Sequence, residues 1–133
     1  MKLIYPALFK PFSDGSGGFV VEFPDLPGCV TEGKNLEDAI EMGIDAASGW
    51  ILGELEDGEN IPKASEYGSI VADKNEMVNM LLLDLDSYAE KYGEKAVRKN
   101  LTIPAWLNTF AEKRNINFSK ILQDALLTMA KSQ

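Results

Sequence analysis

The last third of the chain combines elements that do not fold as an isolated monomer. Residues 99–103, Lys-Asn-Leu-Thr-Ile, alternate polar and apolar side chains, which is typical of a short strand. Pro104 ends this run, because proline imposes an extended backbone on the preceding residue and is tolerated at the first helical position. Two helical runs follow, separated by a polar break at residues 115–117. The predicted order is strand, proline, helix, polar turn, helix.

Both helical runs have apolar residues at helical spacing, and Asn117 is a suitable N-cap for the second run. The apolar positions are Leu107, Phe110 and Ala111, then Phe118, Ile121, Leu122, Ala125, Leu126 and Met129. Roughly forty residues rarely bury enough apolar surface to fold without a metal, a disulfide or a partner. A single strand also leaves its backbone groups unpaired. We therefore predict an obligate dimer that pairs two strands antiparallel and interdigitates the helices.

Residues 98–107 and 117–126 resemble a ribbon-helix-helix domain of the Arc and MetJ repressor type. Their sequences are Arg-Lys-Asn-Leu-Thr-Ile-Pro-Ala-Trp-Leu and Asn-Phe-Ser-Lys-Ile-Leu-Gln-Asp-Ala-Leu. In that family the paired strands form a ribbon that enters the major groove of DNA, where its polar face reads base edges. Lys99 departs from the family pattern, which often has an apolar inward residue there, although a lysine stem can lie along apolar surface.

This resemblance implies six DNA-binding residues, namely Arg98, Asn100, Thr102, Asn117, Phe118 and Ser119. The first three point outward from the ribbon. Arginine can bond guanine bidentately, asparagine can bond adenine, and threonine can contact a base or a methyl group. The last three open the second helix, where the cap and the following backbone amides are expected to bind a phosphate.

The charge of the chain is divided unevenly between its two parts. The whole chain has a net charge of −8, but residues 1–93 contain six Lys and Arg against eighteen Asp and Glu, a net charge of −12. Residues 94–133 contain seven Lys and Arg against three Asp and Glu, a net charge of +4. A basic tail suits the phosphates of DNA, so the acidic part is expected to meet a different partner.

A hairpin is predicted at the start of the chain. Residues 2–10 and 18–23 have strand character, and the cluster Ser-Asp-Gly-Ser-Gly-Gly at residues 13–18 is a turn between them. This turn lacks the Gly-Lys-Ser/Thr ending of a phosphate-binding loop. Residues 24–31 add a stiff turn with two prolines and a short third strand.

From Asn35 the pattern changes to helical spacing, with Asn35 as the cap and acidic residues in the first turn. Gly43 and Gly49 lower the helix propensity, which predicts close packing of this helix on the sheet. Trp50 lies on the apolar stripe and is therefore expected in the core rather than at a partner surface.

Two more strands are predicted at residues 69–73 and 77–85, with a turn at Asn75 between them. Residues 86–93 are polar and are interpreted as either a helical turn or a linker. The boundary between the two parts of the chain is placed near residues 92–94.

Residues 17–33 resemble the N-terminal domain of HicB-type antitoxins. They read Gly-Gly-Phe-Val-Val-Glu-Phe-Pro-Asp-Leu-Pro-Gly-Cys-Val-Thr-Glu-Gly, and residues 5–7 and 36–39 extend the match. The resemblance implies an α+β fold. Residues 1–92 would form a toxin-neutralising domain, which is a partial ribonuclease-H-like antiparallel sheet with one packed helix. Residues 93–133 would form the ribbon-helix-helix domain.

The same resemblance implies that the chain binds and neutralises a small HicA-type ribonuclease toxin and represses the shared operon by binding operator DNA. The chain would be a homodimer through its C-terminal domain, or a tetramer of paired dimers. Glu22 and Asp25 are the expected toxin contacts, from their position in the motif. An alternative is a ribbon-helix-helix repressor whose acidic part senses a small ligand and has no toxin partner.

Catalysis is not expected. The chain has no His, which removes the histidine-dependent nucleophile arrangements, and a single Cys, which suits a reducing cytoplasm. Asp14, Glu22 and Asp25 are close in sequence, but a magnesium site needs carboxylates that converge from separate elements. We predict no catalytic residue, no metal and no cofactor. A stand-alone nuclease, the remaining alternative, would cleave RNA with Mg²⁺. No apolar run approaches a membrane span and no charged-then-apolar leader is present.

Overall fold

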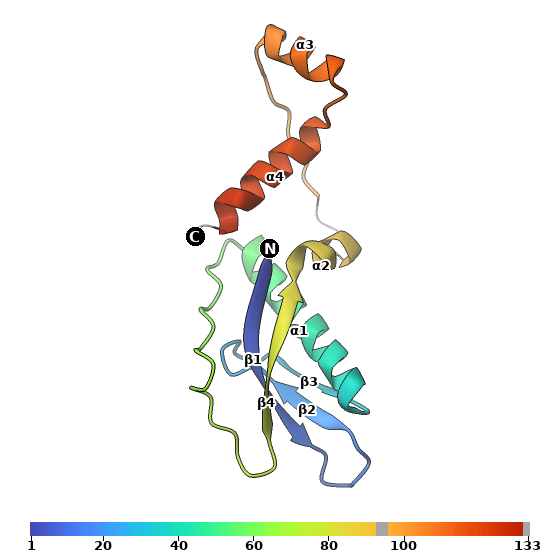
Figure 1. Cartoon of the computed structure of the whole chain (residues 1–133), viewed down its shortest axis with the longest axis vertical. Helices are drawn as coiled ribbons and strands as arrows, with labels where there is room; N and C mark the ends of the chain where they lie inside the picture. The colour runs from blue at the N-terminus through green and yellow to red at the C-terminus, as the bar shows by residue number, and fades with distance from the viewer. Residues whose placement is uncertain (93–95, 132–133) are drawn as a thin grey trace. The chain divides into compact units, whose positions relative to one another are not determined.

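The computed structural model describes residues 1–92 and 96–131. The chain divides into two compact units, Lys2–Glu94 and Lys95–Gln133, which are called the body and the tail below (Figure 1). The body holds an antiparallel sheet with helices, and the regular elements of the described part of the tail are helices. The described residues therefore form an α+β fold with four strands and four helices.

The sheet of the body has four antiparallel strands in the order β3-β2-β1-β4. The strands are β1 (Lys2–Pro11), β2 (Phe19–Glu22), β3 (Val30–Gly33) and β4 (Met77–Asp84). β1 pairs with β4 along most of its length, from Lys2 opposite Asp84 to Phe9 opposite Met77. Its last residues also pair with β2, which confirms the predicted hairpin.

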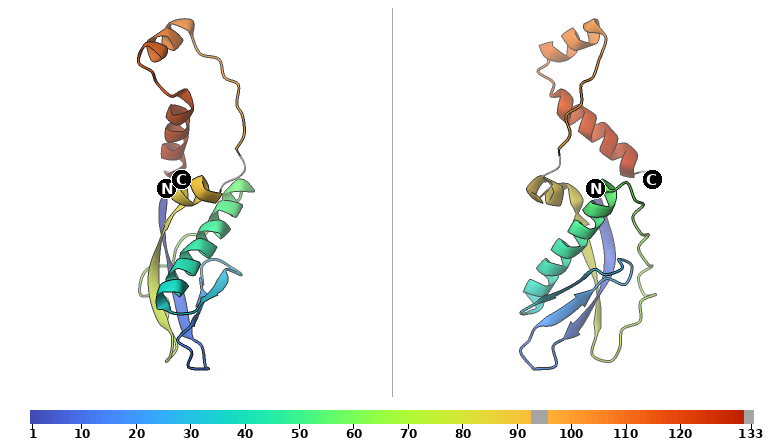
Figure 2. Two further views of the ribbon diagram at one scale, coloured as in Figure 1. Left: turned by 90° about the vertical axis from the view of Figure 1, so that its right-hand side faces the viewer. Right: turned by 180° about the vertical axis from the view of Figure 1, so that it is seen from behind.

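Helix α1 (Leu36–Glu56) lies across one face of this sheet (Figure 2). The Asn35 side chain accepts a hydrogen bond from the Asp38 N–H at 2.8 Å, which confirms the predicted cap. A Cβ at Gly43 would lie 3.1 Å from Leu81 and 3.2 Å from Val21, so the glycine lets the helix approach the sheet closely, as expected. Gly49 instead faces the ring of Tyr88.

The core of the body lies between α1 and the sheet. Its most deeply buried side chains come from alternate positions of the strands and from one stripe of the helix, as strand and helix periodicity require. They are Ala7, Phe9, Val21, Leu83, Ala39, Ala47 and Ile51. Neighbouring positions on the other side of the strands stay accessible, including Ile4 and Leu82, which are opposite each other in the register.

The predicted strand at residues 69–73 is wrong. Residues 57–76 connect α1 to β4 without forming a helix or a strand (Figure 1), and this connection is called the strap below. A β-rich run becomes a strand only beside another strand. The four described strands pair among themselves, whereas Val71 of the strap is 85% exposed. Of the two interpretations of residues 86–93, the helical one holds for the described residues, because α2 spans Leu85–Tyr92.

Trp50 is not in the core. Its ring is only half-buried, and the indole Nε1–H donates to the carbonyl of Pro27 at 3.1 Å. The ring therefore lies over the turn between β2 and β3, with its polar edge satisfied by the backbone.

The tail contains α3 (Ala105–Lys113) and α4 (Phe118–Lys131). Pro104 is the N-cap of α3, so the helix begins one residue later than predicted, and the Pro104 carbonyl accepts the N–H groups of Leu107 and Asn108. Asn115 adopts a positive φ of 51° that ends α3. The Asn117 side chain then accepts the Lys120 N–H at 3.0 Å, which confirms the predicted second cap.

The predicted ribbon strand has no ladder in a single copy. Residues 96–104 of the described chain lead into α3 without strand pairing. A strand of this kind needs a second copy beside it, so the ribbon remains a proposal. Among the described residues, no helix has the length and apolarity required to span a bilayer.

Candidate nucleic-acid and protein interfaces

The tail leaves its apolar face open. Large apolar side chains of α4 that the sequence assigns to a buried stripe are between 36% and 65% exposed in the single copy, namely Phe118, Ile121, Leu122, Leu126 and Met129. Leu107 and Phe110 of α3 are also exposed, whereas Ala111 is buried. Apolar faces of this size on so short a unit indicate an interaction surface rather than a solvated one.

The expected base-reading residues lie ahead of α3. Arg98, Asn100 and Thr102 are all exposed, and they alternate with Leu101 and Ile103. The structure therefore places the three polar side chains on one short accessible segment. Their contacts with DNA remain a proposal, since the ribbon requires a second copy.

The start of α4 has the features of an anion site. The Asn117 side chain is bonded to the third residue of the helix, Lys120. The amides of Phe118 and Ser119 precede the first helical hydrogen bond and have no partner within the helix. These amides and the helix dipole favour a negative charge at this point. Lys120 adds a positive side chain, although Asp124 pairs with it at 3.4 Å.

Glu22 and Asp25, the expected toxin contacts, have different surroundings. Glu22 is exposed on β2, opposite Leu8 of β1 and Val30 of β3. Asp25 is half-buried, and its carboxylate accepts two hydrogen bonds from Ser65, from the N–H at 2.7 Å and from the hydroxyl. Asp25 therefore fastens the strap to the turn between β2 and β3.

A second hydrogen bond fastens the strap nearby. The hydroxyl of Tyr5, on β1, donates to the carbonyl of Pro62. Burial raises the pKa of Tyr5, and the negative charge of Asp25 raises it further, so the phenol stays protonated and able to donate at neutral pH. Sequence reasoning did not assign a role to Tyr5, Pro62 or Ser65, because these contacts join residues 40 or more positions apart.

The outer side of α1 is strongly acidic. The helix has no Lys or Arg in its 21 residues. Its acidic side chains are Glu37, Asp38, Glu41, Asp45, Glu54 and Glu56. Together with the sign of the charge on residues 1–93, this surface favours a basic partner over a nucleic acid.

Asp14 and Cys29, two groups of the body that could take part in chemistry, have local surroundings in the described residues. The Asp14 carboxylate accepts the Ser16 N–H within the β1–β2 turn, and its hydrogen bonds with Ser16 lower its pKa. Burial raises the pKa of Cys29, which keeps the sulfur as an unreactive thiol. Within residues 1–92 and 96–131, His, Cys, Asp and Glu form no group of three that could hold a metal ion.

An acidic sheet-and-helix body and a basic tail with an open apolar face are features of a binding protein with two units. The chain belongs to the HicB-like antitoxin family of bacterial toxin–antitoxin systems, whose model matches residues 5–126. Members of this family are antitoxins and not enzymes.

Two relatives are similar to this chain in sequence. Antitoxin HicB 1 of Photorhabdus laumondii subsp. laumondii is 33% identical over 86 residues, which cover 65% of this chain and 54% of that protein. A 14.9 kDa protein from the rep-hol intergenic region of Haemophilus phage HP1 is 31% identical over 105 residues, which cover 79% of this chain and 76% of that protein.

Solved structures share the fold. A chain of a toxin–antitoxin complex from Streptococcus pneumoniae is 24% identical with a TM-score of 0.59, covering 97% of this chain and 99% of that one. The antitoxin HicB of Burkholderia pseudomallei is 22% identical with a TM-score of 0.57, covering 94% of this chain and 96% of that one. A chain of the HicA3 and HicB3 toxin–antitoxin complex is 20% identical with a TM-score of 0.52, covering 62% of this chain and 99% of that one.

Proposed function

We propose that this chain neutralises a HicA-type mRNA-degrading ribonuclease toxin and represses its own operon by binding operator DNA. The observation that carries the proposal is the division of charge in a chain of the antitoxin family, with an acidic body and a basic tail. The structures of related fold that contain a toxin–antitoxin complex support a toxin as the partner.

In this proposal the body captures the toxin. A ribonuclease that binds RNA needs a basic surface, and the acidic body attracts such a surface over a distance and speeds their encounter. Apolar and aromatic contacts then supply most of the affinity. The toxin is inactive in the complex because the bound body occupies the surface that RNA would use.

The tail binds DNA as a dimer through a ribbon-helix-helix domain formed by residues 93–133. Two copies pair the segments before α3 and bury the open apolar face of α3 and α4 between them. This arrangement is two-fold symmetric, so the operator should consist of two related half-sites. A tetramer of paired dimers would occupy two such operators or one longer site.

Co-expression with the adjacent short reading frame tests the proposal. With the tag on the partner only, we expect both proteins to leave the column together and the complex to lack the ribonuclease activity of the partner alone. Absence of a complex would leave a DNA-binding repressor whose body senses something other than a toxin. Mg²⁺-dependent RNA cleavage by the purified chain alone would contradict the proposal.

Arg98→Ala should weaken operator binding by about 1–3 kcal/mol, because a bidentate contact with guanine is lost. The loss should be smaller on operators that carry another base at that position. Competition binding with single-base operator variants, at one salt concentration, measures both effects. Lys113→Ala, in the last turn of α3, removes a positive charge outside residues 98–102 and is the control. Unchanged affinity for Arg98→Ala would show that the ribbon register is wrong.

A further inference from the structure

The strap is fastened to the rest of the body near its middle, although it has no regular secondary structure. Tyr5, on β1, holds the strap at Pro62, and Asp25, in the turn between β2 and β3, holds it at Ser65. Residues 61, 62, 64 and 65 are correspondingly only partly exposed. Two anchor points within four residues hold the backbone here in one position relative to the core.

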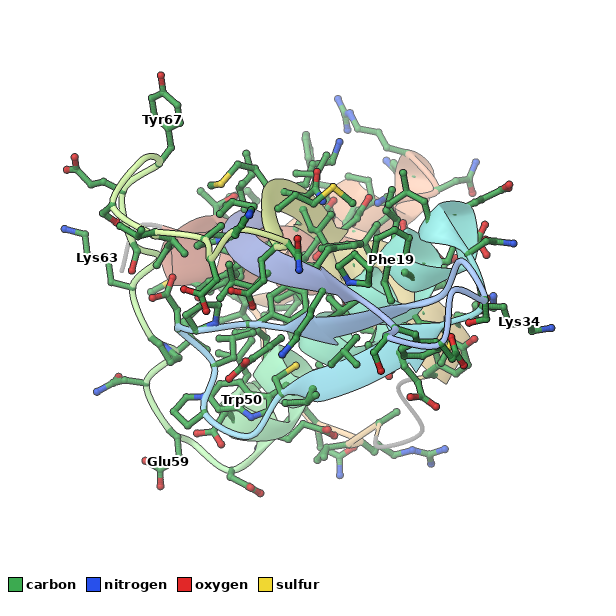
Figure 3. The ribbon with its side chains drawn as sticks, turned by 90° about the horizontal axis from the view of Figure 1, so that it is seen from below. Phe19, Lys34, Trp50, Glu59, Lys63 and Tyr67 are labelled. Carbon is green, nitrogen blue, oxygen red and sulfur yellow. The ribbon has the colours of Figure 1, made fainter. Side chains whose placement is uncertain are left out.

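Immediately after these anchors, the strap turns and exposes an aromatic side chain. The N–H and the hydroxyl of Ser69 both donate to the carbonyl of Glu66, at 3.0 and 2.7 Å, and Gly68 has a φ of +89°. This closed turn has Tyr67 at its tip, 87% exposed. Figure 3 shows Tyr67 extending away from the ribbon, with Lys63 and Glu59 further back on the strap.

The surroundings of Tyr67 are acidic. Residues 57–76 contain five acidic and two basic side chains, and Glu66 is the direct neighbour of Tyr67. A large aromatic side chain on a fixed turn loses little conformational entropy on binding, and tyrosine is enriched among residues that dominate interface energy. The acidic rim favours a positively charged partner.

We propose that the turn of residues 66–69 is the docking point of the strap for the basic ribonuclease partner, with Tyr67 as the anchor side chain. This inference rests on the proposed function and assigns a surface to it. Tyr67 inserts into an apolar recess of the partner, and basic residues around the recess meet Glu66 and the neighbouring carboxylates. Asp25 is a positioning residue that acts through Ser65 and touches no partner atom.

The other surfaces of the body are less specific. The outer side of α1 is acidic, and its exposed apolar side chains, Leu36, Met42 and Leu55, are each only 39–43% exposed, so none of them protrudes as Tyr67 does. The accessible positions Ile4 and Leu82 on the sheet are apolar, but Lys2 and Asp84 flank them with opposite charges, which gives a basic partner no preference. The strap combines a fixed backbone, an exposed ring and a net negative charge.

Tyr67→Ala in the full chain tests the anchor. The probe is the protein from the adjacent reading frame, and its dissociation constant is measured by titration at fixed salt concentration. We expect binding about 30-fold weaker, the effect typical of a dominant interface residue. Tyr67→Phe keeps the ring and should bind within a few-fold of the original chain. Tyr92→Ala removes the same side chain from α2, where Tyr92 is 50% exposed, and should leave the affinity unchanged.

Asp25→Ala tests the positioning role. Releasing the strap should weaken partner binding about tenfold, because the turn must then be ordered at the moment of binding. Asp25→Asn keeps an oxygen that accepts the Ser65 N–H and should recover most of the affinity, which a direct charge contact would not allow. Operator binding should not change in either variant.

The outcomes separate the two proposals. If the original chain does not bind the probe, the proposed function fails. If the original chain binds and Tyr67→Ala binds equally well, the docking surface lies elsewhere and only this inference is overturned. Equal losses for Tyr67→Ala and Tyr92→Ala would also overturn it, since the effect would then not be local.

Discussion

Leu122→Asp should reduce operator affinity more than 100-fold while the body still binds its partner. Leu122 lies at the centre of the apolar stripe of α4 and is 36% exposed in the single copy. In the proposed dimer it is buried against the second copy, where an unpaired carboxylate is strongly unfavourable. Without the dimer, the two strands cannot form a ribbon and the half-sites are no longer bound together.

The measurement pairs operator binding with the molar mass of the full chain in solution. Gln123→Asp places the same charge at the next position of α4, away from the apolar stripe, where the Gln123 amide donates to the Ser119 hydroxyl at 2.8 Å. It should keep the original mass and most of the affinity. If Leu122→Asp remains dimeric and binds DNA, the open face of α4 is not the dimer interface.

Local signals in the sequence predicted the ends of the helices well. Asn35 and Asn117 cap α1 and α4 as expected, because a cap bonds to an amide only three residues away. The β1–β2 hairpin is similarly local, since glycines and a short polar cluster specify its turn. Features of this kind depend on few residues, and those residues are adjacent in the chain.

The strap shows why the rest could not be predicted. Alternation at residues 69–73 predicted a strand, but whether a strand forms depends on a free neighbouring edge, which the sequence of the segment does not contain. The Asp25–Ser65 contact joins residues 40 positions apart, so the role of Asp25 in fastening the strap could not be read from its place in the motif. Trp50 was assigned to the core from its spacing alone, although its indole N–H bonds to the Pro27 carbonyl.

The candidate interaction sites also differ in whether they depend on nearby or on distant residues. The exposed apolar face of the tail was predicted from helical spacing, because that face lies on regular elements. The candidate anchor Tyr67 was not predicted, since its exposure arises from a turn at Gly68 and from two distant hydrogen bonds. An interaction surface on irregular backbone can therefore be identified only from the structure, whereas one on a helix can be predicted from the spacing of its residues.

Gly33→Ala should destabilise the body by about 3 kcal/mol, because the added methyl group has no room. A Cβ at Gly33 would lie 2.3 Å from the backbone nitrogen of Ala39 and 2.4 Å from its Cα. These are backbone atoms of α1, so the end of β3 and the start of the helix would have to separate. Gly33 thus sets how closely α1 can begin beside the sheet.

Gly53→Ala is the matched control, because a Cβ there meets nothing within 4 Å. This change in the interior of α1 should stabilise the body by up to about 1 kcal/mol. Urea unfolding followed by the fluorescence of Trp50, in a Trp106→Phe background that removes the other tryptophan, compares the two variants at one protein concentration. Similar midpoints for both would contradict the close approach at Gly33. A body weakened by about 3 kcal/mol would also be degraded faster in cells.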